Sequence, residues 1–136
     1  MVYTPQWRNT QIIPAEPAVL SCYLNITAAA KDLAIYIPWE YCQLDYSYAV
    51  ALTAEDGTGN LEIDLELDAA SGTEMHSLTL ATSAAVGTIA EGTVTTVAAC
   101  KDLGRHNTDR DAVNIETETG VGTAMLYMYF ISDNTI

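Results

Sequence analysis

The sequence predicts an all-β fold, an antiparallel β-sandwich or jelly roll with an extended N-terminal arm. Residues 61–68 read Leu-Glu-Ile-Asp-Leu-Glu-Leu-Asp, so apolar and acidic side chains alternate without interruption. This period of two is that of a strand, and no helix would sort these residues onto separate faces. Eight tyrosines and many Thr and Val residues also favour strands. Short apolar segments separated by glycine-containing turns are typical of a sandwich.

The chain has the length of one domain preceded by an arm. Its 136 residues suit a single unit, and a hydrophobic content of 49% argues against disorder. We assign residues 18–136 to the β-sandwich domain and residues 1–17 to the arm, because Pro5, Pro14 and Pro17 interrupt strand pairing there. The arm is too apolar for a solvated tail, so it packs either on its own domain or on another surface. Its apolar residues are Tyr3, Trp7, Ile12 and Ile13.

The first elements follow from local sequence. Ala18–Ile26 reads as a strand. Thr27 could cap a short helical turn over residues 28–32, because alanine has the best helix propensity. Leu33–Ile37 reads as a second strand that stops near Pro38.

A hairpin is expected in the middle of the chain. Tyr46–Ala54 and Leu61–Asp68 read as strands, and the glycines within 56–60 supply the positive φ angles of a turn. The first strand would turn Tyr48 and its even-numbered neighbours toward the core. The register that joins the two apolar faces pairs Leu52 with Leu65 and Val50 with Leu67.

Further strands are expected at Leu78–Leu80, Thr93–Ala98, Ala112–Thr117 and Ala124–Ile131, with Lys101–Asp111 as a polar loop. The last strand is apolar on both faces, so it is buried on both sides or faces a subunit partner. We therefore expect a homo-oligomer whose partner-binding residues lie in the arm and on the last strand. These residues are Tyr3, Trp7, Ile12, Ile13, Met125, Tyr127 and Tyr129.

The charge excludes several classes of function. With 18 acidic and 5 basic residues the formal net charge is −13, which leaves too few cations to neutralise nucleic acid or to bind an anionic membrane. The acidic surface acts either as a solubilising exterior or as a face for basic partners or cations. Residues 1–17 lack the apolar region of a signal peptide, and no apolar stretch reaches the length of a membrane helix. The three cysteines are widely spaced, which predicts free buried thiols.

No pattern identifies a catalytic, cofactor or metal site, so we expect a non-enzymatic protein without a cofactor. His106 lies near Cys100, Asp109 and Asp111, but this spacing matches no zinc pattern and a charged loop explains it better. The carboxylates on 62–68 would stand about 7 Å apart along the strand, which is too wide for one compact calcium site. Carboxylate pairs for glycoside hydrolysis are present on any acidic sheet, and nothing distinguishes one pair here.

The C-terminal part of the chain resembles a known group of proteins. Residues 110–124, Arg-Asp-Ala-Val-Asn-Ile-Glu-Thr-Glu-Thr-Gly-Val-Gly-Thr-Ala, run into Met-Leu-Tyr-Met-Tyr-Phe at 125–130. This resembles the closing strand, turn and strand of small β-sandwich virion structural proteins of tailed bacteriophages, of the head-decoration type. Residues 46–68 fit the same layout. The resemblance implies a capsid decoration or cement subunit, made in the host cytoplasm, that forms trimers and binds the capsid lattice of the virion.

Two other functions stay open beside this virion structural role. Trp39, Tyr41 and Tyr46 could stack on sugar rings if exposed, which would suit a carbohydrate-binding β-sandwich module. A small hydrolase is the second alternative.

Overall fold

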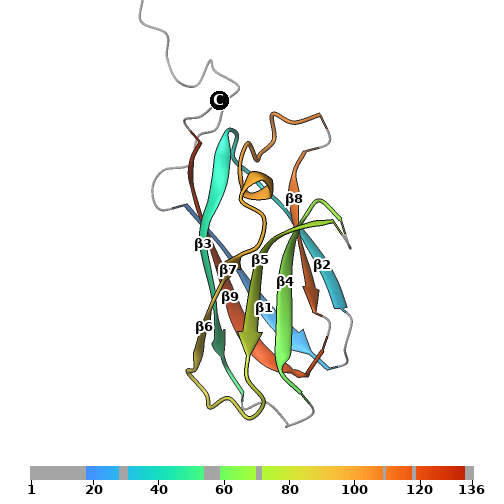
Figure 1. The fold of residues 1–136 in the computed structure, drawn as a ribbon, viewed down its shortest axis with the longest axis vertical. Coiled ribbons are helices and arrows are strands. Elements are labelled where there is room, and N and C mark those ends of the chain that lie inside the picture. Colours follow the sequence, from blue (N-terminus) through green and yellow to red (C-terminus); the bar gives the residue numbers. More distant parts are fainter. Residues whose placement is uncertain are drawn as a thin grey trace, which may run out of the picture.

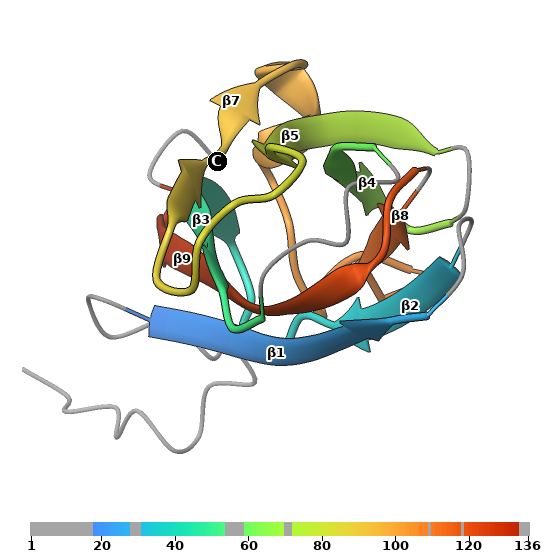
Figure 2. The same ribbon diagram turned by 90° about the horizontal axis from the view of Figure 1, so that it is seen from below.

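The structure confirms the β-sandwich. It is a computed structural model that describes residues 18–27, 31–53, 59–69, 72–108, 110–117 and 119–133. The arm, with Tyr3, Trp7, Ile12 and Ile13, lies outside the described residues. The described residues form two antiparallel sheets that pack face to face, and Figure 2 places β5 and β1 on opposite sides of the molecule.

Most strands that follow one another in sequence lie in different sheets (Figure 1). The four-stranded sheet has the order β1-β9-β3-β6, with bounds Ala18–Ile26, Gly122–Ser132, Cys42–Ala51 and Ile89–Glu91. The five-stranded sheet has the order β2-β8-β4-β5-β7, with bounds Lys31–Tyr36, Ala112–Thr117, Leu61–Leu67, Thr73–Leu80 and Thr93–Val94. A 3₁₀ turn, η2, spans Ala98–Cys100.

Most strands lie where the sequence places them. The bounds of β1 and β8 agree with those expected, and β9 is longer than expected by a few residues. The strand expected at Thr93–Ala98 is reduced to β7, because the chain turns into η2. Lys31 and Asp32 begin β2 and do not belong to a helical turn, and the alanines before them are outside the described residues.

The expected hairpin of β3 and β4 is wrong. β3 pairs with β9 and β6, whereas β4 pairs with β5 and β8 in the other sheet. β3 turns Ser47, Ala49 and Ala51 into the core, where all three are fully buried, and leaves Tyr48 and Val50 half-buried on the outer face. Close packing explains this choice, because small side chains on β3 leave room for the larger ones of the facing sheet.

The core lies between the inner faces of the two sheets. Leu126, Met128 and Phe130 of β9 are fully buried, as are Leu61 and its inward neighbours on β4. Burial of each such side chain stabilises the fold by about 1.5–3 kcal/mol. The indole ring of Trp39 packs on Phe130, with the ring centroids 5.4 Å apart. The thiols of Cys42 and Cys100 are free and buried, whereas that of Cys22 is only half-buried.

One buried polar contact joins the two sheets. The Ser47 hydroxyl on β3 lies 2.7 Å from Nδ1 of His76 on β5, and the two residues are 0% and 1% exposed. Nε2 of His76 has no partner among the described residues. Gly92 closes over this pair, because a Cβ there would lie 2.0 Å from the Ser47 hydroxyl oxygen. Burial lowers the pKa of His76, so its imidazole is neutral in the folded protein.

Acidification should therefore destabilise the fold through His76. The unfolded state takes up a proton near its ordinary pKa of about 6.5, and the folded state takes it up only at lower pH, so this contribution to stability is present above that pH and falls below it. We expect the urea midpoint to fall between about pH 7 and pH 5.5. His76→Gln should flatten this part of the profile, since the other titrating groups are unchanged. Equal slopes for the parent and the variant would contradict a buried neutral His76.

The outer face of the five-stranded sheet is acidic. Asp32, Glu116 and Asp64 lie directly opposite one another on β2, β8 and β4. Glu66 is not solvent-exposed as the alternation suggested but is buried, and Asp68 is exposed. The Asn114 amide donates hydrogen bonds to Asp32 Oδ1 at 3.1 Å and to Glu66 Oε2 at 3.3 Å. This amide offsets the repulsion between carboxylates that like-charge neighbours would otherwise suffer.

Asn114→Asp should expose that repulsion. The substitution keeps the shape of the side chain, removes the shared donor and adds a carboxylate between two others. We expect the free energy of unfolding to fall by about 2–3 kcal/mol at low salt, with partial recovery as salt rises. Asn25→Asp, at an exposed position of β1 on the other sheet, is the matched control. Similar denaturation curves for the two variants would show that Asn114 does not bridge the carboxylates.

Candidate functional site

The outer face of the four-stranded sheet gathers aromatic and apolar side chains from its two central strands. In register, Tyr46 lies opposite Tyr129, Tyr48 opposite Tyr127, and Val50 opposite Met125. These six residues of β3 and β9 are named the tyrosine face. Met125, Tyr127 and Tyr129, which the sequence predicts to bind a partner, are half-buried on this outer face, while their neighbours on β9 point inward.

The edge strands extend this apolar surface. Val19 and Tyr23 of β1 lie opposite Tyr129 and Met125, and both are exposed. On the other side, Ile89 of β6 is exposed opposite Val50. Ser21 of β1 and Glu91 of β6 lie on the same face opposite Tyr127 and Tyr48, so the apolar surface is centred on β3 and β9 and reaches the edge strands at single positions. An exposed apolar patch is the kind of feature that marks an interaction site.

The tyrosine rings pack on one another. The ring centroids of Tyr48 and Tyr127 are 4.8 Å apart with planes 22° from parallel, and Tyr129 lies 6.0 Å from Tyr48 at 23°. Tyr46 is tilted against Tyr48 and Tyr129. Because stacked rings cover each other's faces, the accessible part of the surface consists of ring edges and hydroxyl groups.

The hydroxyl groups form hydrogen bonds within and beside the tyrosine face. The Tyr46 hydroxyl donates to Glu91 Oε1 of β6 at 3.0 Å, and this bond raises the pKa of Tyr46. A hydrogen bond with Tyr129, together with desolvation and the neighbouring phenols, raises the pKa of Tyr48 to about 12. The six positions of the tyrosine face hold no charged side chain, and the exposed Asp45 lies beside them in a β-bulge.

The three aromatic residues that suggested a sugar platform are not brought together. Trp39 is half-buried against Phe130, and Tyr41 stacks on His106 with ring centroids 4.0 Å apart. Only Tyr46 belongs to the tyrosine face. These contacts leave the three rings in separate environments.

The loop around His106 is held by local contacts. Nδ1 of His106 accepts a hydrogen bond from the Tyr41 backbone N–H at 3.2 Å, so Nε2 carries the proton toward Asp102 Oδ1 at 2.7 Å. Asp111 and Cys100 are buried, and Asp109 is outside the described residues. Within the described ranges, no group of three or more His, Cys, Asp or Glu side chains is arranged to hold a metal ion.

The Ser47–His76 pair has the spacing of a nucleophile and a general base. Sequence reasoning missed this pair because the two residues are far apart in the chain and belong to no motif. Both side chains are enclosed, at 0% and 1% exposure, so a substrate could not reach the Ser47 hydroxyl in this conformation. The arrangement therefore serves to join the sheets.

The phenol of Tyr48 should ionise at an unusually high pH. Its pKa of about 12 compares with about 10 for an ordinary tyrosine, so a pH titration of phenolate absorbance should show a late step in the folded protein. Tyr129→Phe removes the hydrogen-bond partner and should lower the pKa of Tyr48. Tyr36→Phe, on the exposed end of β2, is the control and should leave that late step in place. An unchanged late step in Tyr129→Phe would contradict this hydrogen bond.

No protein-family model matches the chain, and neither curated proteins nor solved structures give a match. In the described part of the chain, no helix is long and apolar enough to cross a membrane. With no matching protein to suggest a site, the tyrosine face is the surface feature on which the proposed function is based.

Proposed function

We propose that the chain is a non-enzymatic structural subunit that assembles with copies of itself, as a homotrimer, through the tyrosine face. The observation that carries this proposal is the apolar outer face of β3 and β9, which no described element covers. Tyrosine suits such a contact, because it buries a large rigid surface and its hydroxyl group can bond across an interface.

Charge favours contact through this face over the other. A chain of net charge −13 repels its copies, and the outer face of the five-stranded sheet adds opposed carboxylates. The tyrosine face itself is uncharged. Copies that meet there keep their acidic sheets apart and exposed to water.

The strand order supports a virion role. The order β1-β9-β3-β6 facing β2-β8-β4-β5, with β7 added at one edge, is the order expected of a jelly roll. Viral capsid proteins use this architecture, and so do lectins. Since a fold alone does not define a function, the phage assignment depends on the resemblance of residues 46–131 to head-decoration proteins. In that role the trimer binds the capsid lattice on the surface of the virion.

Tyr127→Thr should weaken self-association without unfolding the chain. Threonine keeps the strand propensity but removes the ring from the centre of the tyrosine face. We expect sedimentation to show trimers for the parent and a dissociation constant raised by about tenfold or more for the variant. Association of the parent should strengthen as salt rises from low levels, because salt screens the acidic sheets. Tyr36→Thr, which changes an exposed tyrosine on the other sheet, is the control.

Two results would contradict the proposal. One is a parent that stays monomeric at high concentration and moderate salt. The other is an association that Tyr127→Thr and Tyr36→Thr weaken equally. Binding of glycans by a monomer, lost in Tyr46→Ala, would favour the carbohydrate-binding alternative.

A further inference from the structure

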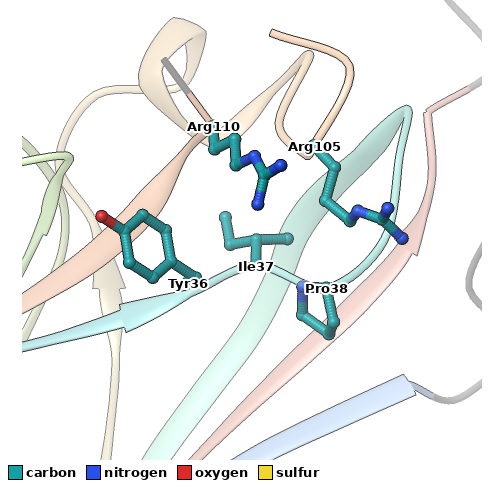
Figure 3. A pocket seen from close by; sticks show the side chains of 5 residues that line it. All are labelled: Tyr36, Ile37, Pro38, Arg105 and Arg110. Atoms are coloured by element: carbon teal, nitrogen blue, oxygen red, sulfur yellow. The ribbon is translucent and has the colours of Figure 1, made fainter. Parts of the chain in front are cut away.

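A pocket with two arginines lies at one end of the sandwich, away from the tyrosine face. It has a volume of about 360 Å³ and lies where β2 ends and the loop of residues 101–111 begins to cover the core. Figure 3 shows its lining side chains, which are Tyr36, Ile37, Pro38, Arg105 and Arg110. The volume is within the range of pockets that hold small organic ligands.

The contact between Gly104 and Asp111, named the loop neck here, joins the two ends of the loop, and both arginines lie next to it in sequence. The Asp111 carboxylate accepts a hydrogen bond from the Gly104 backbone N–H at 2.8 Å and another from the Asn107 amide. Arg105 follows Gly104 and Arg110 precedes Asp111, so the Asp111–Gly104 contact brings the two arginines to the same place. A Cβ at position 104 would lie 2.4 Å from the carbonyl oxygen of Trp39, so only glycine fits this neck.

Backbone contacts fix the neck to the apolar lining of the pocket. The Ile37 N–H donates to the carbonyl oxygen of Asp111 at 3.0 Å, and the Arg105 N–H donates to that of Trp39 at 2.8 Å. Ile37 is 1% exposed and forms the closed part of the pocket, whereas Tyr36 is 69% exposed beside it. In Figure 3 the guanidinium of Arg110 lies over Ile37, whereas the Arg105 side chain descends toward Pro38 and its guanidinium points away from Arg110.

The guanidinium groups at this pocket form no direct ion pair with a described residue. Only 5 of the 136 residues are basic, and two of them line this one pocket. In the same loop, Nε2 of His106 pairs with Asp102, whereas neither arginine side chain has a hydrogen bond or ion pair with a described residue. Arg110 also has a φ of 55°, a conformation that residues other than glycine seldom adopt.

We infer that this pocket binds a small organic oxyanion, a carboxylate or a phosphate monoester on an apolar body. Guanidinium groups bind both kinds of oxyanion with paired hydrogen bonds. Arg110 and Arg105 would offer an anion positive charge at the rim of the pocket, and an apolar body would contact Ile37, Pro38 and the ring of Tyr36. The inference is independent of the proposed assembly, because none of these residues belongs to the tyrosine face.

Titration calorimetry on the full chain tests the inference with four probes: benzoate, phenyl phosphate, inorganic phosphate and benzyl alcohol. We expect saturable binding of benzoate or phenyl phosphate with a dissociation constant of about 1 mM or tighter. Inorganic phosphate lacks the apolar body and benzyl alcohol lacks the charge, so both should bind at least about tenfold more weakly. The preferred oxyanion shows whether the natural ligand is a carboxylate or a phosphate monoester.

Arg105→Gln and Arg110→Gln should each weaken binding of the preferred probe by about tenfold. Lys101→Gln, which removes a cation outside the pocket, is the matched control and should bind normally. A thermal melt of each variant shows that it is folded. The inference is overturned by no saturable binding up to about 10 mM, by equal binding of benzyl alcohol, or by equal losses in Lys101→Gln and the arginine variants. Sedimentation of the arginine variants should match that of the parent, which separates this test from that of assembly.

Discussion

Only the side chains on one face of each strand can pack between the two sheets, so the side chains on the other face must lie on the outside. The rest of the structure follows from this constraint. β9 lies between β1 and β3 and fills the core with Leu126, Met128 and Phe130. The pleat then sends Met125, Tyr127 and Tyr129 to the outside. β3 contributes small inward residues and large outward ones, so its Tyr48 and Val50 join the same outer surface. The tyrosine face is therefore a direct consequence of how the core is packed.

The two outer faces of the sandwich differ in chemistry. The five-stranded sheet presents Asp32, Asp64 and Glu116 in one row, with Asn114 bonded between neighbouring carboxylates. The four-stranded sheet presents tyrosines whose rings stack on each other. Water solvates the first face well and the second poorly. A molecule with this asymmetry has a defined orientation toward any partner that covers its apolar side, with the carboxylates directed away from it.

The sequence was sufficient for the fold class and for several strands, because strict alternation in β4 and β8 leaves little choice of conformation. It failed for the partners of β3. Tyr48 and Val50 are larger than the residues that alternate with them, so hydrophobicity alone assigns them to the core, whereas packing volume selects Ala49 and Ala51. Because of the same error, the sequence did not predict that the β3 residues Tyr48 and Val50 belong to the tyrosine face. The arginine pocket depends on the Asp111–Gly104 contact, and no local pattern in the sequence predicts that contact.

Tyrosine differs from an aliphatic residue at these positions because it adds a polar hydroxyl group to an apolar surface of this strongly acidic chain. Leu or Ile at these positions would present an apolar sheet face with no polar group, a feature that promotes aggregation. The phenols instead bind one another and Glu91, so the face holds a defined set of hydrogen bonds before any partner arrives. In the proposed assembly, a second copy would have to match those hydroxyl groups as well as cover the rings. Hydrogen bonding thus restricts which surfaces can dock on the face, while burial of the rings supplies the driving force.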